Sequence, residues 1–206
     1  RVRRLMRSYA RNQGGQVPNT VLAQDVAAND ESPINEETVA SYLNALRKIF
    51  VVEDMPAWNP NLRSKAAIQS SDTRYFVDPS IAVAALGVGP KDLMNDLNTF
   101  GLFFESMAVR DLEIYGESLD AKLYHYQDYD NDEFDAVLQF PDGTWSAFEV
   151  KFNPADVDAA AADLVRIAAK FVRNPPRSLA VVVGKQGIAH RRKDGVYVLP
   201  ITALKP

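Results

Sequence analysis

Residues 133–151 are the part of the sequence that most restricts the fold. Apolar and polar positions alternate at its start, with Phe134, Ala136, Leu138 and Phe140 interleaved between Glu133, Asp135, Val137 and Gln139. This period of two is typical of a half-buried β-strand. Pro141-Asp142-Gly143 then forms a turn signal, and Trp145–Lys151 is a second strand-like run. The segment therefore predicts a β-hairpin.

Helices and further strands are expected on both sides of this hairpin. Gly101–Tyr115 has apolar residues at helical spacing and is followed by Gly116, which predicts a helix that ends there. After the hairpin, Asn153-Pro154 opens an Ala-rich helix that reaches Phe171. Other strands are expected at Lys122–Gln127, Leu179–Val183 and Val196–Ile201. The order α-β-β-β-α-β-β predicts an antiparallel meander and a helical crossover to a parallel strand, a mixed α/β fold.

The N-terminal part predicts a smaller helical domain. Helices are expected at Arg1–Arg11, from a cap at Asn19 or Thr20 to Ala27, and at Asn35–Phe50. Two extended segments follow, near Val51–Trp58 and Thr73–Phe76, with a polar loop between them. Three helices and a strand pair predict a winged helix-turn-helix.

In that interpretation, Asn35–Phe50 is the candidate recognition helix. Its buried stripe is expected to contain Val39, Tyr42, Leu43, Leu46, Ile49 and Phe50. However, Glu36 and Glu37 occupy its first turn, where a DNA-reading helix usually offers basic or amide side chains. Docking of this helix against another domain is therefore at least as good an interpretation as DNA reading.

Short linking helices are expected between the two halves. Asp78-Pro79 predicts a helix start, with an end at Gly87, and Pro90 predicts a further helical turn at Lys91–Asn98. The boundary is expected between Val88 and Phe100. This gives a winged-helix-like domain with linker helices at residues 1–88 and a second domain at residues 89–206.

Composition excludes several kinds of protein. The 206 residues are 47% apolar, enough for a buried core, and include no cysteine, which excludes disulfides and thiolate metal sites. No apolar run approaches the ~20 residues that span a bilayer, so no membrane association is expected. The absence of cysteine agrees with a cytoplasmic location, and the start at Arg-Val-Arg-Arg suggests a fragment of a longer protein.

The net charge of −4 argues mildly against tight, nonspecific wrapping of DNA. Basic residues nevertheless cluster at two places. These clusters are Arg1, Arg3, Arg4, Arg7 and Arg11, and Arg191-Arg192-Lys193. Solvated charge on a helix face and on a turn is the favoured interpretation of both.

Four residues carry the predicted chemistry: Glu105, Asp135, Glu149 and Lys151. Glu149 and Lys151 are two apart on one strand, so their side chains leave the same face. An antiparallel pairing can bring Asp135 close to Glu149, although the sequence does not give the register. Two carboxylates can bind Mg²⁺ or Mn²⁺, and an ammonium beside them can position water and offset charge on a phosphate. These types suit metal-dependent hydrolysis of a phosphodiester.

The Glu-Val-Lys tripeptide alone is weak support, because alternating charges also occur on any solvent-exposed strand face. The order of helical Glu, strand Asp, Pro-Asp-Gly turn and strand Glu-x-Lys is more specific and predicts a PD-(D/E)xK nuclease-like αβββαβ core. His125 is expected to be structural, and Tyr124, Tyr126 and Trp145 to pack rather than stack on bases. The acidic residues 128–133 lack calcium-loop spacing and are expected to form a solvated hairpin.

The chain also resembles a known group of proteins across nearly its whole length. The stretches that carry the resemblance are Arg74–Pro79, Leu102–Ser106, Tyr124–Tyr126, Glu133–Asp135 and Phe148–Lys151. They are similar to the region that follows the P-loop ATPase core in a large group of prokaryotic AAA-type ATPases. The resemblance implies a winged helix followed by a restriction-endonuclease-like domain.

For the site, the resemblance implies metal ligands at Asp135 and Glu149, a helical acid at Glu105 and a catalytic Lys151. Ser106 stands where Asn is expected after the helical Glu. It also implies an N-terminal P-loop ATPase domain as a partner in the full-length protein. ATP would bind only to that domain, because this sequence contains no Gly-x-x-x-x-Gly-Lys-Ser/Thr motif.

Two functions remain open at this point. The first is a metal-dependent nuclease that acts on DNA. The second is a catalytically inactive module that binds DNA or protein and regulates the ATPase. The Asp135, Glu149 and Lys151 triplet favours the first, and the acidic net charge with Glu36 and Glu37 favours the second. The sequence does not indicate the oligomeric state.

Overall fold

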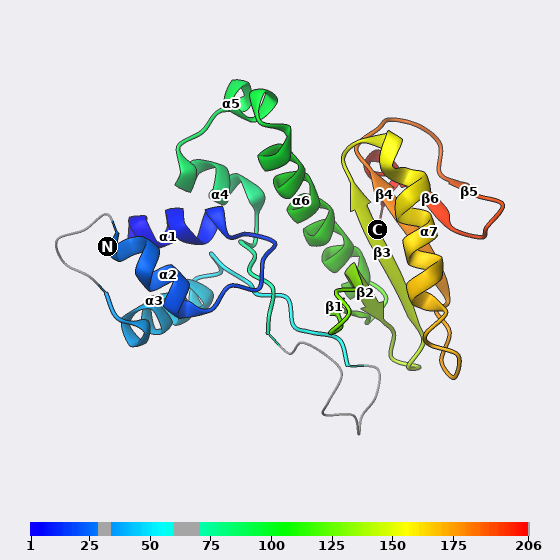
Figure 1. The fold of residues 1–206 in the computed structure, drawn as a ribbon, viewed down its shortest axis with the longest axis horizontal. Helices are drawn as coiled ribbons and strands as arrows, with labels where there is room; N and C mark the ends of the chain where they lie inside the picture. The colour runs from blue at the N-terminus through cyan, green and yellow to red at the C-terminus, as the bar shows by residue number, and fades with distance from the viewer. Residues whose placement is uncertain (29–33, 60–70, 206) are drawn as a thin grey trace. The chain divides into compact units, whose positions relative to one another are not determined.

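A computed structural model describes residues 1–28, 34–59 and 71–205 (Figure 1). The chain forms two compact units. The N-terminal unit consists of Arg1–Met55 and Asp72–Ser106, and the C-terminal unit consists of Pro56–Ser71 and Met107–Pro206. The division passes through helix α6, Leu97–Glu117.

Helices build the N-terminal unit. They are α1 (Val2–Arg11), α2 (Asn19–Ala27), α3 (Glu36–Lys48), α4 (Pro79–Leu86), α5 (Pro90–Asn95) and the first part of α6. Their shared core includes Leu5, Leu22, Val39 and Leu43, all of them buried. The expected helices are thus confirmed, within a residue or two at most ends.

Local hydrogen bonds explain where two of these helices begin. The Asn35 side chain accepts a hydrogen bond from the backbone amide of Thr38 at the start of α3. Asp78 does the same for the Ser80 amide at the start of α4. Both are N-cap bonds that satisfy amides left unpaired by the helix itself. The helix start predicted at Asp78-Pro79 is confirmed.

Three details of the N-terminal prediction are wrong. Helix α2 follows Pro18 and has no side-chain cap, because the Asn19 amide oxygen accepts a hydrogen bond from Arg74 instead. Helix α3 ends at Lys48, so Ile49 and Phe50 leave the buried stripe and are 65% and 80% exposed. Phe50 adopts a left-handed φ of 54°, which stops a helix.

The expected wing is only partly formed among the described residues. Val52 pairs with Phe76 and Met55 with Thr73 in isolated antiparallel bridges, without continuous strands. The polar loop expected between them lies largely in residues 60–70, outside the described residues. Trp58, expected in the first strand of the wing, belongs to the core of the C-terminal unit.

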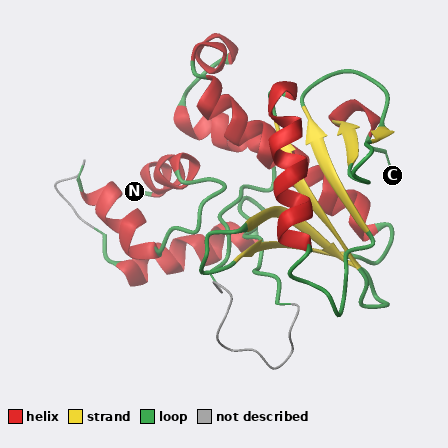
Figure 2. Cartoon of the chain, turned by 45° about the vertical axis from the view of Figure 1, so that its right-hand side comes forward, coloured by secondary structure: helices red, strands yellow, loops and turns green. Residues whose placement is uncertain are grey.

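A six-stranded mixed sheet forms the C-terminal unit (Figure 2). Its strands are β1 (Lys122–Gln127), β2 (Glu133–Gln139), β3 (Trp145–Lys151), β4 (Ser178–Val183), β5 (His190–Arg191) and β6 (Tyr197–Pro200), in the order β1-β2-β3-β4-β6-β5. The pairs β1–β2, β2–β3 and β5–β6 are antiparallel, whereas β4 is parallel to both β3 and β6. The predicted meander with a parallel crossover strand is confirmed, as is the mixed α/β class.

Helix α7 (Val157–Ala168) makes that crossover and packs along β3 and β4 (Figure 1). A short 3-10 turn, Pro154–Asp156, precedes it, capped by the Asn153 side chain. An aromatic cluster fills the core beneath it, including Trp58, Tyr126, Phe134, Trp145 and Phe171. The rings of Trp58 and Trp145 lie 4.4 Å apart between centroids. Because Tyr126 and Trp145 are buried, the prediction that they pack is confirmed.

Two features of the C-terminal unit differ from the prediction. Helix α6 continues through Gly116 to Glu117, and a Cβ at Gly116 would lie 2.7 Å from Leu138 Cδ2, so the Leu138 side chain would have to shift. Val137, expected on the polar face of its strand, is fully buried because α7 covers that face. In the part of the chain that the structure describes, no helix is long and apolar enough to cross a membrane.

Candidate active site

The register of β2 and β3 brings Asp135 and Glu149 opposite one another. The ladder between these strands ends at the pair Ala136 and Phe148. Asp135 and Glu149 are the next residues outward on the two strands, so they lie side by side where the ladder stops. Lys151 follows two residues later and shares the face of Glu149. The proximity that the sequence left undetermined is therefore present.

Where β2 and β3 separate, the Asp135 side chain accepts a hydrogen bond from the β3 backbone in place of a β2 carbonyl group. The Val150 amide donates a hydrogen bond to Asp135 Oδ2, with an N···O distance of 2.7 Å. On its other side β3 stays paired with β4 as far as Lys151 and Val183. Asp135 thus satisfies a buried strand amide and is held in place by it.

Glu149 and Lys151 form an ion pair next to Asp135. Lys151 Nζ lies 2.6 Å from Glu149 Oε1. The Glu149 side chain is 13% exposed and that of Lys151 is 34% exposed, so the pair sits at the boundary of the protein. The Lys151 ammonium can therefore reach a bound molecule while it stays close to the acids.

Burial raises the pKa of both carboxyl groups. The pKa of Asp135 rises from 3.8 to about 6, through loss of solvent and against the opposing charge of Lys151. The pKa of Glu149 rises from 4.5 to about 8, first through burial and then through the negative charge of Asp135. Two adjacent acids whose negative forms are disfavoured are a candidate for a functional site.

The remaining oxygens suit a hard cation. Asp135 Oδ1 and Glu149 Oε2 have no hydrogen-bond partner among the described residues, while the other oxygen of each acid is occupied by Val150 or Lys151. Within the described ranges, no group of three His, Cys, Asp or Glu residues could hold a metal. A pair of carboxylates nevertheless fits Mg²⁺, which typically keeps several waters and takes one or two carboxylates plus substrate phosphate oxygens.

Glu105, the fourth predicted site residue, lies in the N-terminal unit. Its Oε1 accepts a hydrogen bond of 2.8 Å from the Tyr75 hydroxyl, and it lies close to Gly14. The neighbouring Ser106 is buried and its hydroxyl has no partner within the described part of the chain. The structure therefore groups Asp135, Glu149 and Lys151, and it groups Glu105 with Tyr75.

Sequence comparisons place this site in a family. Residues 100–204, slightly more than half of the chain, match the profile of a Domain of unknown function (DUF4143). The chain belongs to the DUF4143 family. The DUF4143 domain occurs in AAA-ATPase-associated proteins. The DUF4143 match includes Asp135, Glu149 and Lys151.

A second profile matches the other end of the chain. Residues 1–92 are similar to a Domain of unknown function (DUF8612). No curated protein and no solved structure matches the chain.

Other candidate residues in the DUF4143 domain have structural roles. His125 is buried, and its Nε2 lies 2.8 Å from the Ser71 carbonyl oxygen. Asp128 accepts hydrogen bonds from the Asp130 and Asp132 amides and pairs with Lys170 at 2.7 Å. The ion pairs of Lys170 with Asp128 and Asp132 hold this segment in place more firmly than the expected solvated hairpin would be held.

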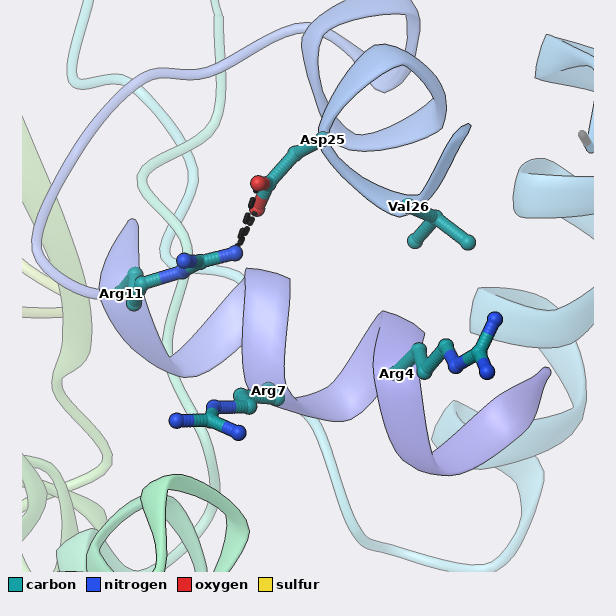
Figure 3. A pocket seen from close by; sticks show the side chains of 5 residues that line it. All are labelled: Arg4, Arg7, Arg11, Asp25 and Val26. Carbon is teal, nitrogen blue, oxygen red and sulfur yellow. Dashed lines mark hydrogen bonds and ion pairs between the residues drawn. The ribbon is translucent and has the colours of Figure 1, made fainter. Parts of the chain in front are cut away.

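One basic cluster outside the DUF4143 domain lines a hollow that the sequence analysis did not foresee. Arg4, Arg7 and Arg11 line a hollow on the N-terminal unit, together with Asp25 and Val26 (Figure 3). Their spacing of three and four residues within one helix is the signal that could have revealed it. The hollow itself was not predictable, because its other side is formed by Asp25 and Val26 of α2.

Proposed function

We propose that the C-terminal unit is a divalent-metal-dependent nuclease that hydrolyses DNA phosphodiesters. The observation that carries this proposal is the gathering of Asp135, Glu149 and Lys151 at the place where β2 and β3 separate. The raised pKa values of both acids support it, because a bound cation would stabilise the charged carboxylates that burial disfavours.

Each side chain has a distinct role in this proposal. A bound Mg²⁺ or Mn²⁺ would polarise the scissile phosphate and lower the pKa of an attacking water. Asp135 and Glu149 would each offer it one carboxylate oxygen. The Val150 amide would keep the Asp135 carboxylate oriented. The Lys151 ammonium would hydrogen-bond the attacking water or a phosphate oxygen and offset the charge that develops there.

The finer fold assignments belong to the same proposal. A helix, an antiparallel three-stranded meander, a crossover helix and a parallel strand, with Asp on the second strand and Glu-x-Lys on the third, support a PD-(D/E)xK nuclease-like core. Three helices followed by the bridges of Val52 with Phe76 and Met55 with Thr73 support a winged helix in the N-terminal unit.

The resemblance to regions that follow a P-loop core, and the occurrence of DUF4143 in AAA-ATPase-associated proteins, support a link to an ATPase. We propose that such an ATPase domain is the physiological partner of this chain and that ATP binds there. A motor would supply DNA to the nuclease or remodel it, whereas the residues of the present chain perform the cleavage.

A second function rests on a specific observation. Glu105, the helical acid of the proposed site, is hydrogen-bonded to Tyr75, and no cluster of three acids occurs in the described ranges. A nuclease fold with only two available acids can persist as an inactive domain that binds DNA or protein. In that case the pair Glu149 and Lys151 would stabilise the fold and perform no reaction.

Cleavage distinguishes the two functions. Purified chain is incubated with supercoiled plasmid or branched DNA and with Mg²⁺, Mn²⁺ or EDTA. If the chain is a nuclease, we expect metal-dependent cleavage that is lost in both the Lys151→Ala and the Asp135→Asn variants. Cleavage that survives both substitutions would point to contamination or another site. Absence of cleavage by chain that still binds DNA would support the second function.

A further inference from the structure

Helix α1 presents one basic face. Arg4, Arg7 and Arg11 are separated by three and four residues, so their side chains leave the same side of the helix. The opposite side carries Leu5 and Tyr9, which are fully buried in the N-terminal core. All three arginines are exposed. The basic face is therefore fixed in place by the apolar face that anchors α1.

These arginines border a hollow of about 280 Å³ whose other wall is α2 (Figure 3). Asp25 and Val26 line the α2 side. Asp25 is the single acid among the lining residues that the structure describes, and it pairs with Arg11 at 2.5 Å. Arg7 has no ion-pair or hydrogen-bond partner in the parts of the chain that the structure describes. The described residues that line the hollow thus carry three positive charges and one negative charge.

We infer that this hollow, the α1–α2 hollow, binds phosphate groups of a nucleic-acid backbone. Guanidinium groups match phosphate oxygens with paired hydrogen bonds, and all three cations here are arginines. Contacts of this kind hold a nucleic acid without reading its bases. Recognition is therefore expected to be independent of sequence and sensitive to salt.

The inference moves the DNA-binding face of the N-terminal unit away from α3. Glu36 and Glu37 occupy the first turn of α3, where they would repel phosphate. The first turn of α1 carries no acid, and Arg11 stands in its last turn. The only basic residues in the last turn of α3 are Arg47 and Lys48, and Arg47 is already paired with Asp54.

A membrane surface is a poorer ligand for this hollow. A helix that binds lipid headgroups usually inserts its own apolar face into the bilayer. The apolar face of α1 is committed to the core through Leu5 and Tyr9. An acidic protein segment would satisfy the charges but would lack the regular phosphate spacing that several arginines can engage together. Both remain as outcomes of the test.

The test measures DNA binding without cleavage. The 206-residue chain is titrated into a fluorescent duplex in EDTA at several salt concentrations, and the logarithm of the binding constant is plotted against that of salt. Arg4→Gln combined with Arg7→Gln should weaken binding roughly tenfold at low salt and lower the salt slope by about two. Asp25→Asn should tighten binding, because it removes the opposing charge and releases Arg11.

A matched variant controls for overall charge. Lys48→Gln combined with Lys91→Gln removes two exposed positive charges from α3 and α5 of the same unit. It should change affinity and slope much less than the arginine pair. Equal effects of both double variants, or weaker binding by Asp25→Asn, would overturn the inference. Binding to anionic vesicles or to polyglutamate but not to duplex or single-stranded DNA would also overturn it.

The outcome is separable from that of the nuclease proposal. The binding assay contains no metal, so it measures binding without cleavage, and Arg4 and Arg7 lie in a different unit from Asp135, Glu149 and Lys151. A chain that binds DNA through the α1–α2 hollow but never cleaves it would sustain this inference and overturn the nuclease. If Arg4→Gln with Arg7→Gln leaves DNA binding unchanged while the chain cleaves DNA, the nuclease proposal stands and the inference about the α1–α2 hollow is overturned.

Discussion

Asp135 accepts a hydrogen bond from the Val150 backbone amide across the edge where β2 and β3 separate, with an N···O distance of 2.7 Å. The contact gives one carboxylate two tasks. One oxygen completes the hydrogen bonding of a buried strand, and the other has no hydrogen-bond partner among the described residues. Because strand geometry fixes the Val150 amide, the position of Asp135 is fixed with it. The hydrogen bond from Val150 thus holds one of the two proposed metal ligands in position.

Substitutions at Asp135 should separate these two tasks. Asp135→Asn keeps an oxygen that can accept from Val150, whereas Asp135→Ala leaves a buried amide unsatisfied. At pH 5, below the pKa of about 6 of Asp135, its carboxyl is mostly protonated and charge effects are small. There, Asp135→Ala should unfold with a free energy about 1–3 kcal/mol lower than that of Asp135→Asn. Urea unfolding measures the difference. Equal stabilities of the two variants would show that the hydrogen bond contributes little.

The stability of the metal-free chain should fall as pH rises. The folded-state pKa values of Asp135 and Glu149, about 6 and about 8, lie above their ordinary values of 3.8 and 4.5. The folded state therefore binds protons more tightly, and this stabilisation is complete below pH ~4 and lost progressively up to pH ~8. Urea unfolding in EDTA between pH 5 and pH 8.5 should show the loss.

Glu149→Gln provides the comparison for this pH dependence. Its neutral amide removes one titrating group and the repulsion on Asp135, so the decline should be much shallower. The variant should be more stable than the natural chain at pH 8 even though it loses the ion pair with Lys151. A decline of equal steepness in both proteins would place the responsible groups elsewhere.

Lys151 should contribute to cleavage far more than a neighbouring lysine does. Lys151→Gln removes the ammonium beside the acids, and the cleavage rate should drop about a hundredfold or more, as for loss of one charge-stabilising donor. Lys185 lies in the exposed loop just after β4 and has no ion-pair partner among the described residues. Lys185→Gln should leave the rate within a few-fold. Similar losses in both variants would indicate a general charge effect.

Gly184, which follows β4, lies so close to Phe152 that a larger side chain would not fit there. A Cβ on Gly184 would lie 2.8 Å from the Phe152 carbonyl oxygen and 2.7 Å from its ring, whereas one on Gly187 would meet Pro200 at 3.6 Å. Gly184→Ala should therefore destabilise the chain by about 1–3 kcal/mol and Gly187→Ala by much less. Thermal unfolding of both variants checks this. Equal melting temperatures would mean that the Phe152 segment can shift without cost.

Much of the C-terminal fold follows from local signals in the sequence. The strands at Lys122–Gln127 and Trp145–Lys151 were predicted at the observed residues, because the alternating pattern and the Pro141-Asp142-Gly143 turn specify the hairpin. The pair Glu149 and Lys151 followed from the period of a strand. Their proximity to Asp135 did not, because register depends on how two strands align in space.

The errors share one cause, which is packing between distant segments. Gly116 was predicted to end a helix, yet α6 continues to Glu117, and Gly116 packs close to the Leu138 side chain of β2. Trp58 was predicted in a wing, yet it is buried beside Trp145. Glu105 remains a predicted site residue, and its hydrogen bond to Tyr75 was not foreseen because it depends on a segment thirty residues away.

The most direct test of the account is a titration of the chain with Mn²⁺, followed by electron paramagnetic resonance of the free ion. The account predicts one Mn²⁺ per chain, with binding that strengthens from pH 6 to pH 8 as Asp135 and Glu149 lose their protons. Glu149→Gln should abolish the site and Lys185→Gln should retain it. Absence of Mn²⁺ binding by the natural chain, or binding that Glu149→Gln leaves intact, would contradict the account.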